Sequence, residues 1–173
     1  MACTLIGGIA ADCRDSLGGI KQVKVKIWPG ISTIATDFTI TSGDVAIASG
    51  SRSTWYTYFI ESNTAMFTSN PTTNRQNGTL FYDEQLKIIF NKFSAKLRNE
   101  IHVLAQNRLL FAVKDQNDTH WLMGVDEGMM MEPSTSTSGT AKGDRSGSEL
   151  TFKAEEKQAM VTMTQAVYDT LVT

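Results

Sequence analysis

The fold of this chain is decided by the stretch Gly78-Thr-Leu-Phe-Tyr-Asp-Glu-Gln-Leu-Lys-Ile-Ile-Phe-Asn-Lys-Phe-Ser-Ala-Lys-Leu-Arg-Asn-Glu-Ile-His-Val-Leu-Ala-Gln-Asn-Arg-Leu-Leu-Phe-Ala-Val113. Apolar side chains recur two residues apart over residues 80–90, with Glu84 as the polar exception. That spacing is typical of a strand with one buried face. The stretch therefore begins with a long half-buried strand.

The apolar spacing changes after Ser94 to that of an amphipathic helix. Leu97, Ile101 and Leu104 then fall on one face, which we expect to pack against a sheet. Ser94 is a good N-cap, because its hydroxyl can accept a hydrogen bond from an amide of the first turn. The pattern predicts one helix at about residues 94–106 and no other helix in the chain.

The rest of the chain has strand patterns separated by turn residues. A hairpin is predicted where two apolar runs flank Asp115-Gln-Asn-Asp-Thr119, and a second where two runs flank Glu61-Ser-Asn-Thr64, ending at Asn70-Pro71. Further strands are predicted at 20–28, 34–40, 45–49, 148–154 and 158–167. Eight or nine strands and a single flanking helix indicate a mainly β protein, folded as a sandwich or a barrel.

The organisation is that of one domain over residues 1–173, with an N-terminal arm at about 1–18 and a long loop at about 132–147. The loop is rich in Ser, Thr and Gly, so we expect it to have no structure of its own and to be ordered by a partner. An ordinary flexible loop is the alternative. If a partner orders the loop, Met129, Met130 and Met131 would form an adaptable apolar patch at its base. Lys142, Asp144 and Arg145 would form ion pairs between subunits.

Composition and motifs argue against several classes of function. Charged residues make up 20% of the chain and the net charge is −2, which argues against a duplex DNA-binding module. Cys3 and Cys13 are too few for a zinc site, and no nucleophile, base and orienting group stand in a recognisable pattern. No apolar run reaches the roughly 20 residues that span a bilayer. We expect a protein that is not an enzyme, needs no cofactor or metal and does not enter a membrane.

Short pieces of the sequence resemble the tail tube, or major tail, proteins of phages from Bacteroides-type hosts. The resemblance spans most of the chain, although residues 31–73 contribute little to it. The residues that match are Cys13, Gly18-Gly-Ile-Lys21, Asn77-Gly-Thr-Leu-Phe-Tyr82, Lys92-Phe-Ser-Ala-Lys-Leu-Arg98, Leu104-Ala-Gln-Asn-Arg-Leu109, Asp115-Gln-Asn-Asp118, Trp121-Leu-Met-Gly124, Thr140-Ala-Lys-Gly-Asp-Arg-Ser-Gly147, Leu150-Thr-Phe152 and Glu155-Glu156.

The resemblance implies a structural virion protein, made in the cytoplasm of the bacterial host. Such proteins form hexameric rings that stack into a tube and contact other tail proteins. Inner sheets line the channel, and arms and loops bind adjacent rings. DNA passes through the lumen without specific binding, so we expect a lumen face that is neutral or acidic and lacks a dense basic stripe.

Two alternatives remain at this point. One is another virion ring or decoration protein, such as a tail terminator, a head–tail connector or a capsid decoration protein. The other is a secreted β-sandwich binding module, for example for carbohydrate, with Trp55, Tyr56 and Tyr58 as candidate aromatics. Neighbouring residues of a strand point to opposite faces, which weakens that aromatic cluster.

Overall fold

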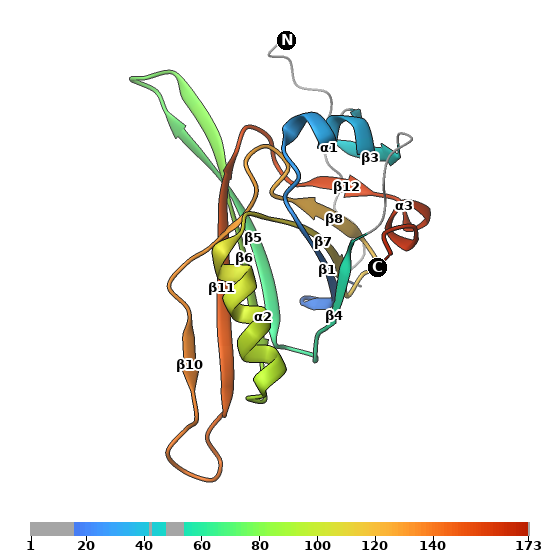
Figure 1. The fold of residues 1–173 in the computed structure, drawn as a ribbon. Coiled ribbons are helices and arrows are strands. Elements are labelled where there is room, and N and C mark those ends of the chain that lie inside the picture. Colours follow the sequence, from blue (N-terminus) through green and yellow to red (C-terminus); the bar gives the residue numbers. More distant parts are fainter. Residues whose placement is uncertain (1–15, 42, 48–53, 173) are drawn as a thin grey trace.

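Two β-sheets packed face to face, with three helices around them, form the computed structural model of this chain (Figure 1). It describes residues 16–41, 43–47 and 54–172. The predicted mainly β sandwich is therefore confirmed. Most of the predicted N-terminal arm, with Cys3 and Cys13, lies outside the described residues.

Sheet A has seven strands in the order β2-β3-β12-β8-β7-β1-β4. All neighbours are antiparallel except β3 and β12, which are parallel. The strands are β1 (Ile20–Ile27), β2 (Phe38–Thr41), β3 (Asp44–Ile47), β4 (Tyr56–Phe59), β7 (Leu109–Asp115), β8 (His120–Met123) and β12 (Val161–Met163).

Sheet B is antiparallel, with the order β10-β11-β6-β5 and a short strand, β9, that also pairs with β11. Its members are β5 (Ala65–Asn74), β6 (Thr79–Phe90), β9 (Met130–Met131), β10 (Thr135–Thr137) and β11 (Gly147–Glu156). At about 3.4 Å per residue, the 12 residues of β6 extend about 40 Å. This is the long strand predicted at 80–90, and it lies inside the sheet because it pairs with β5 on one side and β11 on the other.

The main core fills the space between the sheets. Every second residue of β6 and β11 points inward, so Leu86, Ile88, Leu150 and Phe152 are buried against sheet A. The Phe111 and Phe152 rings meet across the interface with centroids 4.9 Å apart. This alternation is the period-two pattern expected of a strand with one buried face.

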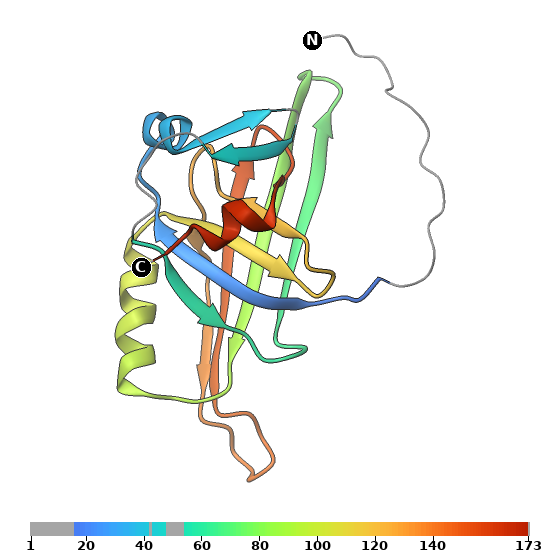
Figure 2. The same ribbon diagram turned by 90° about the vertical axis from the view of Figure 1, so that its right-hand side faces the viewer.

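A second core covers the other face of sheet A. It is closed by α1 (Ile31–Asp37) and α3 (Gln165–Asp169), which lie on the side away from sheet B (Figure 2). Because both faces of sheet A are covered, β7 is buried from Leu109 to Val113 without a break. Lys24 of β1 is also buried there, and its Nζ donates to the carbonyls of Tyr168 and Leu171 at 2.8 Å each.

The predicted helix is α2 (Ala95–Gln106). Ser94 is its N-cap, since the Ser94 Oγ accepts from the Leu97 amide at 3.1 Å. Leu104 is buried as predicted, but Leu97 and Ile101 are only half-buried. Ile101 nevertheless packs against the main core as predicted. Neither side chain is fully buried, because α2 lies along one side of the sandwich (Figure 2).

Two further helices contradict the prediction of one. Residues 34–40 were expected as a strand, but α1 occupies Ile31–Asp37 and β2 begins only at Phe38. Ile34 and Phe38 are four residues apart, which also fits one face of a helix. Ile34 is 1% exposed in the second core, and its packing there favours the helix over the predicted strand. The third helix, α3, follows an N-cap at Thr164.

The hairpin predicted around Glu61–Thr64 is also wrong. The two strands exist, but β4 pairs with β1 in sheet A and β5 pairs with β6 in sheet B. The turn therefore joins the two sheets. Nor does Asn70-Pro71 end the pairing, because β5 continues through Pro71 to Asn74 at an edge of the sheet, where proline is tolerated.

The burial of Leu104 gives a direct test of how α2 is held. Leu104→Ala removes a buried side chain and should lower the free energy of unfolding by about 2–5 kcal/mol. The neighbouring Val103 is 47% exposed, so Val103→Ala should change it by less than about 0.5 kcal/mol. Urea unfolding of both variants measures the difference, and equal stabilities would contradict the packing of α2 described above.

Candidate assembly surfaces

The outer face of sheet B carries paired charges, together with the apolar side chains of Met66 and Ile89. Lys87 Nζ lies 2.6 Å from Glu149, and Lys153 Nζ lies 3.0 Å from Asp83 and 3.8 Å from Glu155. Arg145, just before β11, lies 3.0 Å from Glu149. Among these residues, three carboxylates face three cations. The face is therefore close to neutral and has no basic stripe.

Both edges of sheet B are unpaired among the described residues. One edge is the ten-residue β5, and the other is formed by the short strands β9 and β10. The Ile89 amide donates to the Thr64 carbonyl at 2.8 Å. Thr64 and every second residue after it therefore form their backbone hydrogen bonds with β6. Alternate residues of β5, including Phe67 and Ser69, therefore direct their N–H groups away from β6. Pro71 belongs to that same set.

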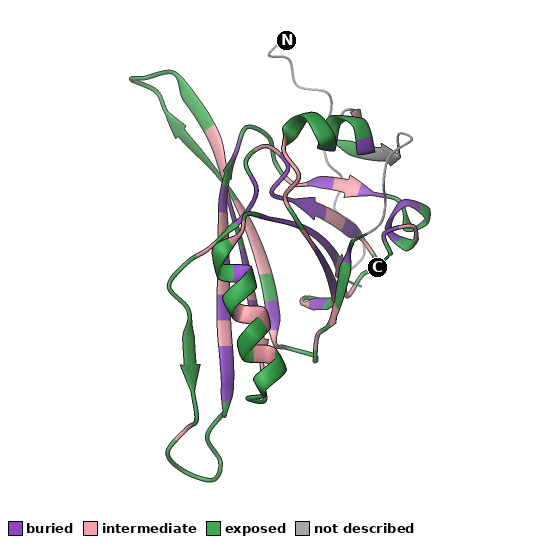
Figure 3. Cartoon of the chain, in the orientation of Figure 1, coloured by how far each residue is buried: buried purple, intermediate pink, exposed green. Residues whose placement is uncertain are grey.

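Two hairpins extend past the core from opposite ends of sheet B (Figure 3). The β5–β6 hairpin turns at residues 75–78, and the β10–β11 hairpin turns at residues 138–146. In Figure 3 both are largely exposed, whereas the middle of the sheet is buried. The register places Tyr82 opposite Glu156 and Phe90 opposite Ser148, so the two turns lie at opposite ends of the sheet.

The loop expected at about 132–147 is a hairpin arm, which corrects the prediction that it has no structure of its own. Thr135–Thr137 pair with Gly147–Glu149 of β11. The Asp144 carboxylate accepts from the amides of Thr140 and Ala141 at 2.9 and 2.7 Å, which closes the turn and holds the pKa of Asp144 below its usual range. The ladder of β11 supplies the backbone partners that composition alone does not reveal.

The residues predicted to make inter-subunit contacts do not form one patch. Met129 is fully buried in the main core, Met131 is half-buried, and only Met130 is largely exposed. Asp144 is used within its own turn, and Arg145 pairs with Glu149 of the same chain. Lys142 is exposed near the hairpin turn. The prediction is wrong for Met129, because its backbone pairs with Leu109 and carries its side chain inside.

The candidate aromatic cluster is divided between two surfaces. Trp55 is 1% exposed and packs edge-on against Phe38 in the second core. Tyr56 and Tyr58 instead line two adjoining hollows of about 420 and 240 Å³ between β4 and α2. The Tyr58 hydroxyl donates to Glu100 at 3.1 Å, which contributes with burial to raising the pKa of Tyr58. Trp55 and the two tyrosines thus lie on different surfaces, as the alternation of side chains along a strand predicted.

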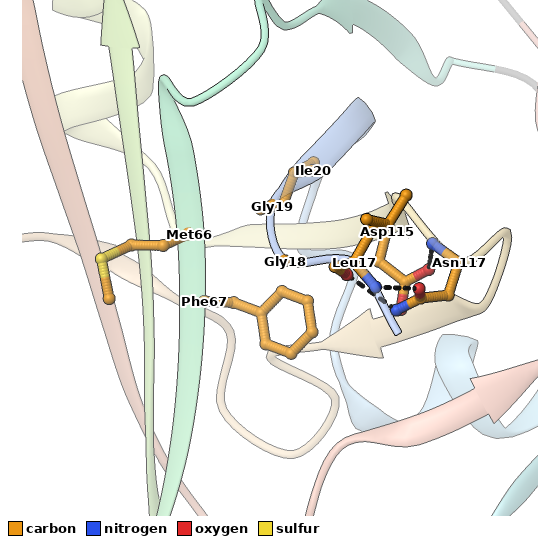
Figure 4. A pocket seen from close by; sticks show the side chains of 8 residues that line it. All are labelled: Leu17, Gly18, Gly19, Ile20, Met66, Phe67, Asp115 and Asn117. Carbon is orange, nitrogen blue, oxygen red and sulfur yellow. Dashed lines mark hydrogen bonds between the residues drawn. The ribbon is translucent and has the colours of Figure 1, made fainter. Parts of the chain in front are cut away.

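A clamp fixes the point at which the chain enters sheet A (Figure 4). The Asn117 side chain accepts from the Leu17 amide at 2.7 Å and donates to the Leu17 carbonyl at 2.9 Å. Beside it is a hollow of about 180 Å³, toward which the ring of Phe67 points, while Met66 points to the other side of β5. Leu17, near the start of the described chain, therefore lies close to β5.

The described residues hold no group of three or more His, Cys, Asp or Glu that could bind a metal ion. His102 is exposed on α2, and His120 is buried with its ring 4.6 Å from that of Tyr168. In the same part of the chain, no helix is long and apolar enough to cross a membrane.

Comparisons with protein-family models, with curated proteins and with solved structures gave no match.

Gly147 is the residue that fixes the base of the β10–β11 hairpin. A Cβ placed on it would lie 1.9 Å from the Phe90 carbonyl oxygen. Gly147→Ala should therefore push β11 away from β6 and lower the free energy of unfolding by about 1–3 kcal/mol. Gly143→Ala is the matched control, because nothing lies within 4 Å of the added Cβ. Thermal unfolding that fails to separate the two variants would contradict this close approach.

Proposed function

We propose that this chain is a structural subunit of a bacteriophage virion that assembles into stacked rings, as the tail tube through which DNA passes. The observation that carries the proposal is the long sheet B, open at both edges, with a polar outer face. Exposed edges attract other strands, and proteins that remain monomeric usually block them. A sheet with two compatible edges can join copies head to tail, and such contacts close into a ring if the rotation between copies allows it.

The outer face of sheet B is our candidate for the lumen of the ring. Its charges balance, and each cation already pairs with a carboxylate of the same chain. Affinity for nucleic acid without sequence preference comes mainly from unpaired Lys and Arg on phosphates. A face with internally paired charges would let DNA slide past with little retention, as a conduit requires.

The two hairpins support stacking of rings. They leave sheet B at opposite ends, so in a ring built through the edges of that sheet they would project from the two faces of the ring (Figure 1). A projecting hairpin can pair or pack with a neighbour in the next ring. In the family that the sequence resembles the rings are hexamers, and we propose the same number here.

The assembly itself is the first measurement. The purified chain should form rings or tubes in negative-stain electron microscopy and a species of several subunits in analytical ultracentrifugation. A stable 19.0 kDa monomer at high concentration would overturn the proposal. Isolated closed rings that never stack would favour a terminator or connector ring instead.

Backbone pairing at the β5 edge can be tested without changing the ladder inside the sheet. Ser69→Pro removes an N–H that points away from β6, so it should leave folding largely intact and block the joining of copies. Ser69→Ala is the matched control, because it removes the same hydroxyl but keeps that N–H. Circular dichroism establishes folding and ultracentrifugation measures assembly. If Ser69→Pro assembles as Ser69→Ala does, β5 is not the joining edge.

The β10–β11 hairpin is expected to act between rings. Replacing residues 138–146 with a two-residue Asn-Gly turn shortens the arm and keeps a turn suited to a hairpin. The shortened chain should keep its melting temperature and still form rings, yet fail to grow long tubes. Tubes of normal length, counted in micrographs, would show that the arm has no role in stacking.

A further inference from the structure

Glu84 and Glu156 are buried carboxyls on neighbouring strands of sheet B. Glu84 is 1% exposed and Glu156 is 2% exposed. The register places Glu84 opposite Ala154 and Glu156 opposite Tyr82, so both side chains leave the same face of the sheet, two positions apart. They point toward sheet A, into a region where every neighbouring inward residue of β6 and β11 is apolar, aromatic or the other carboxyl.

Both carboxyls hold the connection between the sheets. Residues 124–128 lead from β8 of sheet A to β9 at the β11 edge of sheet B. The Gly124 amide donates to Glu84 Oε2 at 3.3 Å, and the Asp126 amide donates to Glu156 Oε2 at 2.7 Å. The Glu127 amide also bonds to Glu156. Side chains of one sheet therefore bind backbone that belongs to the connection from the other.

One oxygen of this pair has no partner. Glu156 Oε1 is buried and accepts no hydrogen bond, and the Ser69 hydroxyl, opposite Glu84 on β5, is also buried without a partner. A buried carboxylate oxygen with no donor is costly. A proton bound by the two carboxyls would give the unpartnered Glu156 oxygen a share in a hydrogen bond that the described residues do not otherwise provide.

The surrounding charges favour the same result. Burial, and next the charge of Glu156, raises the pKa of Glu84 to about 8. Burial likewise raises the pKa of Glu156 to about 7, with the carboxylates of Asp126 and Glu127 adding to the shift and their backbone amides opposing it.

The cations nearby do not compensate these charges. Arg108 donates to the Glu127 carbonyl at 3.1 Å, and Lys157 contributes its backbone amide to Asp126. Both side chains are exposed.

We propose that Glu84 and Glu156 together bind one proton at neutral pH, and that loss of this proton releases the 124–128 connection from sheet B. Because the pKa of each carboxyl is raised in the folded chain from the usual 4.5, to about 8 for Glu84 and about 7 for Glu156, the stabilisation is complete in acid, falls as the pH rises above about 4.5 and is fully lost above about pH 8. The association of the two sheets then depends on pH between those limits. This inference does not depend on the proposed assembly.

The direct test is a carbon-13 NMR titration of the Glu side-chain carboxyls between pH 4 and 10, assigned with Glu84→Gln and Glu156→Gln. At least one of the two should titrate above pH 6.5 in the wild-type chain. Should both titrate below pH 5.5, the pair holds no proton at neutral pH and the proposal is overturned.

The variants test the consequence for the connection. In Glu84→Gln the new side-chain amide can accept from the Gly124 amide and donate to Glu156, so this variant imitates the protonated pair at every pH. From pH 5 to 8 the unfolding equilibrium constant of the wild-type chain should rise, by up to about tenfold per pH unit for each proton that the folded chain keeps and the unfolded chain has lost, and it should level off above about pH 8. In Glu84→Gln the rise should be smaller, because only Glu156 still titrates.

Glu155→Gln is the matched control, since Glu155 lies on the outer face with its side chain 62% exposed. It should follow the wild-type chain. Hydrogen exchange at the amides of Gly124 and Asp126 then locates the effect: protection should fall at alkaline pH in the wild-type chain and persist in Glu84→Gln. Parallel pH profiles for wild type and Glu84→Gln would overturn the proposal. If Glu84→Gln does not fold, Glu156→Gln and the wild-type titration decide the question.

Discussion

The antiparallel pairing of β6 with β5 on one side and β11 on the other determines the position of almost everything else. It aligns the inward residues of three strands, so that Leu86 and Phe152 form one surface facing sheet A. A shift of one residue would turn those side chains outward and bring Lys87 and Lys153 into the core. The cost of burying unpaired ammonium groups opposes such a one-residue shift.

Sheet A differs from sheet B in that both of its faces are covered. Its central strand β7 is apolar over five consecutive residues, and β1 must carry a lysine into the second core. Lys24 is tolerated there because its ammonium group binds two carbonyls at the end of α3 and lies 4.3 Å from the centre of the Tyr168 ring. The burial lowers the pKa of Lys24, against the opposing charge of Asp169. The C-terminal segment is thereby tied to β1.

What could be predicted from sequence depended on whether the deciding interaction was local. The capped helix after Ser94 and the turn at Asp115, whose side chain accepts from the amides of Asn117 and Thr119, are stabilised by contacts within a few residues. Both were predicted correctly. The strand expected around Ile34 and the hairpin expected around Glu61 failed, because the second core and the choice of sheet decide them.

The candidate surfaces show the same division. Glu84 was visible as a polar exception in an apolar alternation, yet nothing local paired it with Glu156, which is 72 positions further along the chain. Only the register of β6 and β11 brings the two together. The arm around Thr135 has too little apolar surface to fold alone, and it is ordered because β11 offers it a ladder. Long-range strand pairing is the information that composition lacks.

The two halves of the β5 edge differ in how they are protected. The outer half contains Pro71, whose missing N–H interrupts any strand that would add there, and its residues are exposed on both faces. The inner half, Ala65–Ser69, has neither a proline nor a charge, and Met66 stands 52% exposed beside it. If aggregation were the only pressure on this edge, the inner half would need the same protection as the outer. Among the described residues the inner half has no such protection, which fits the proposed covering of this edge by another copy; Pro71 would limit how far along β5 that pairing can run.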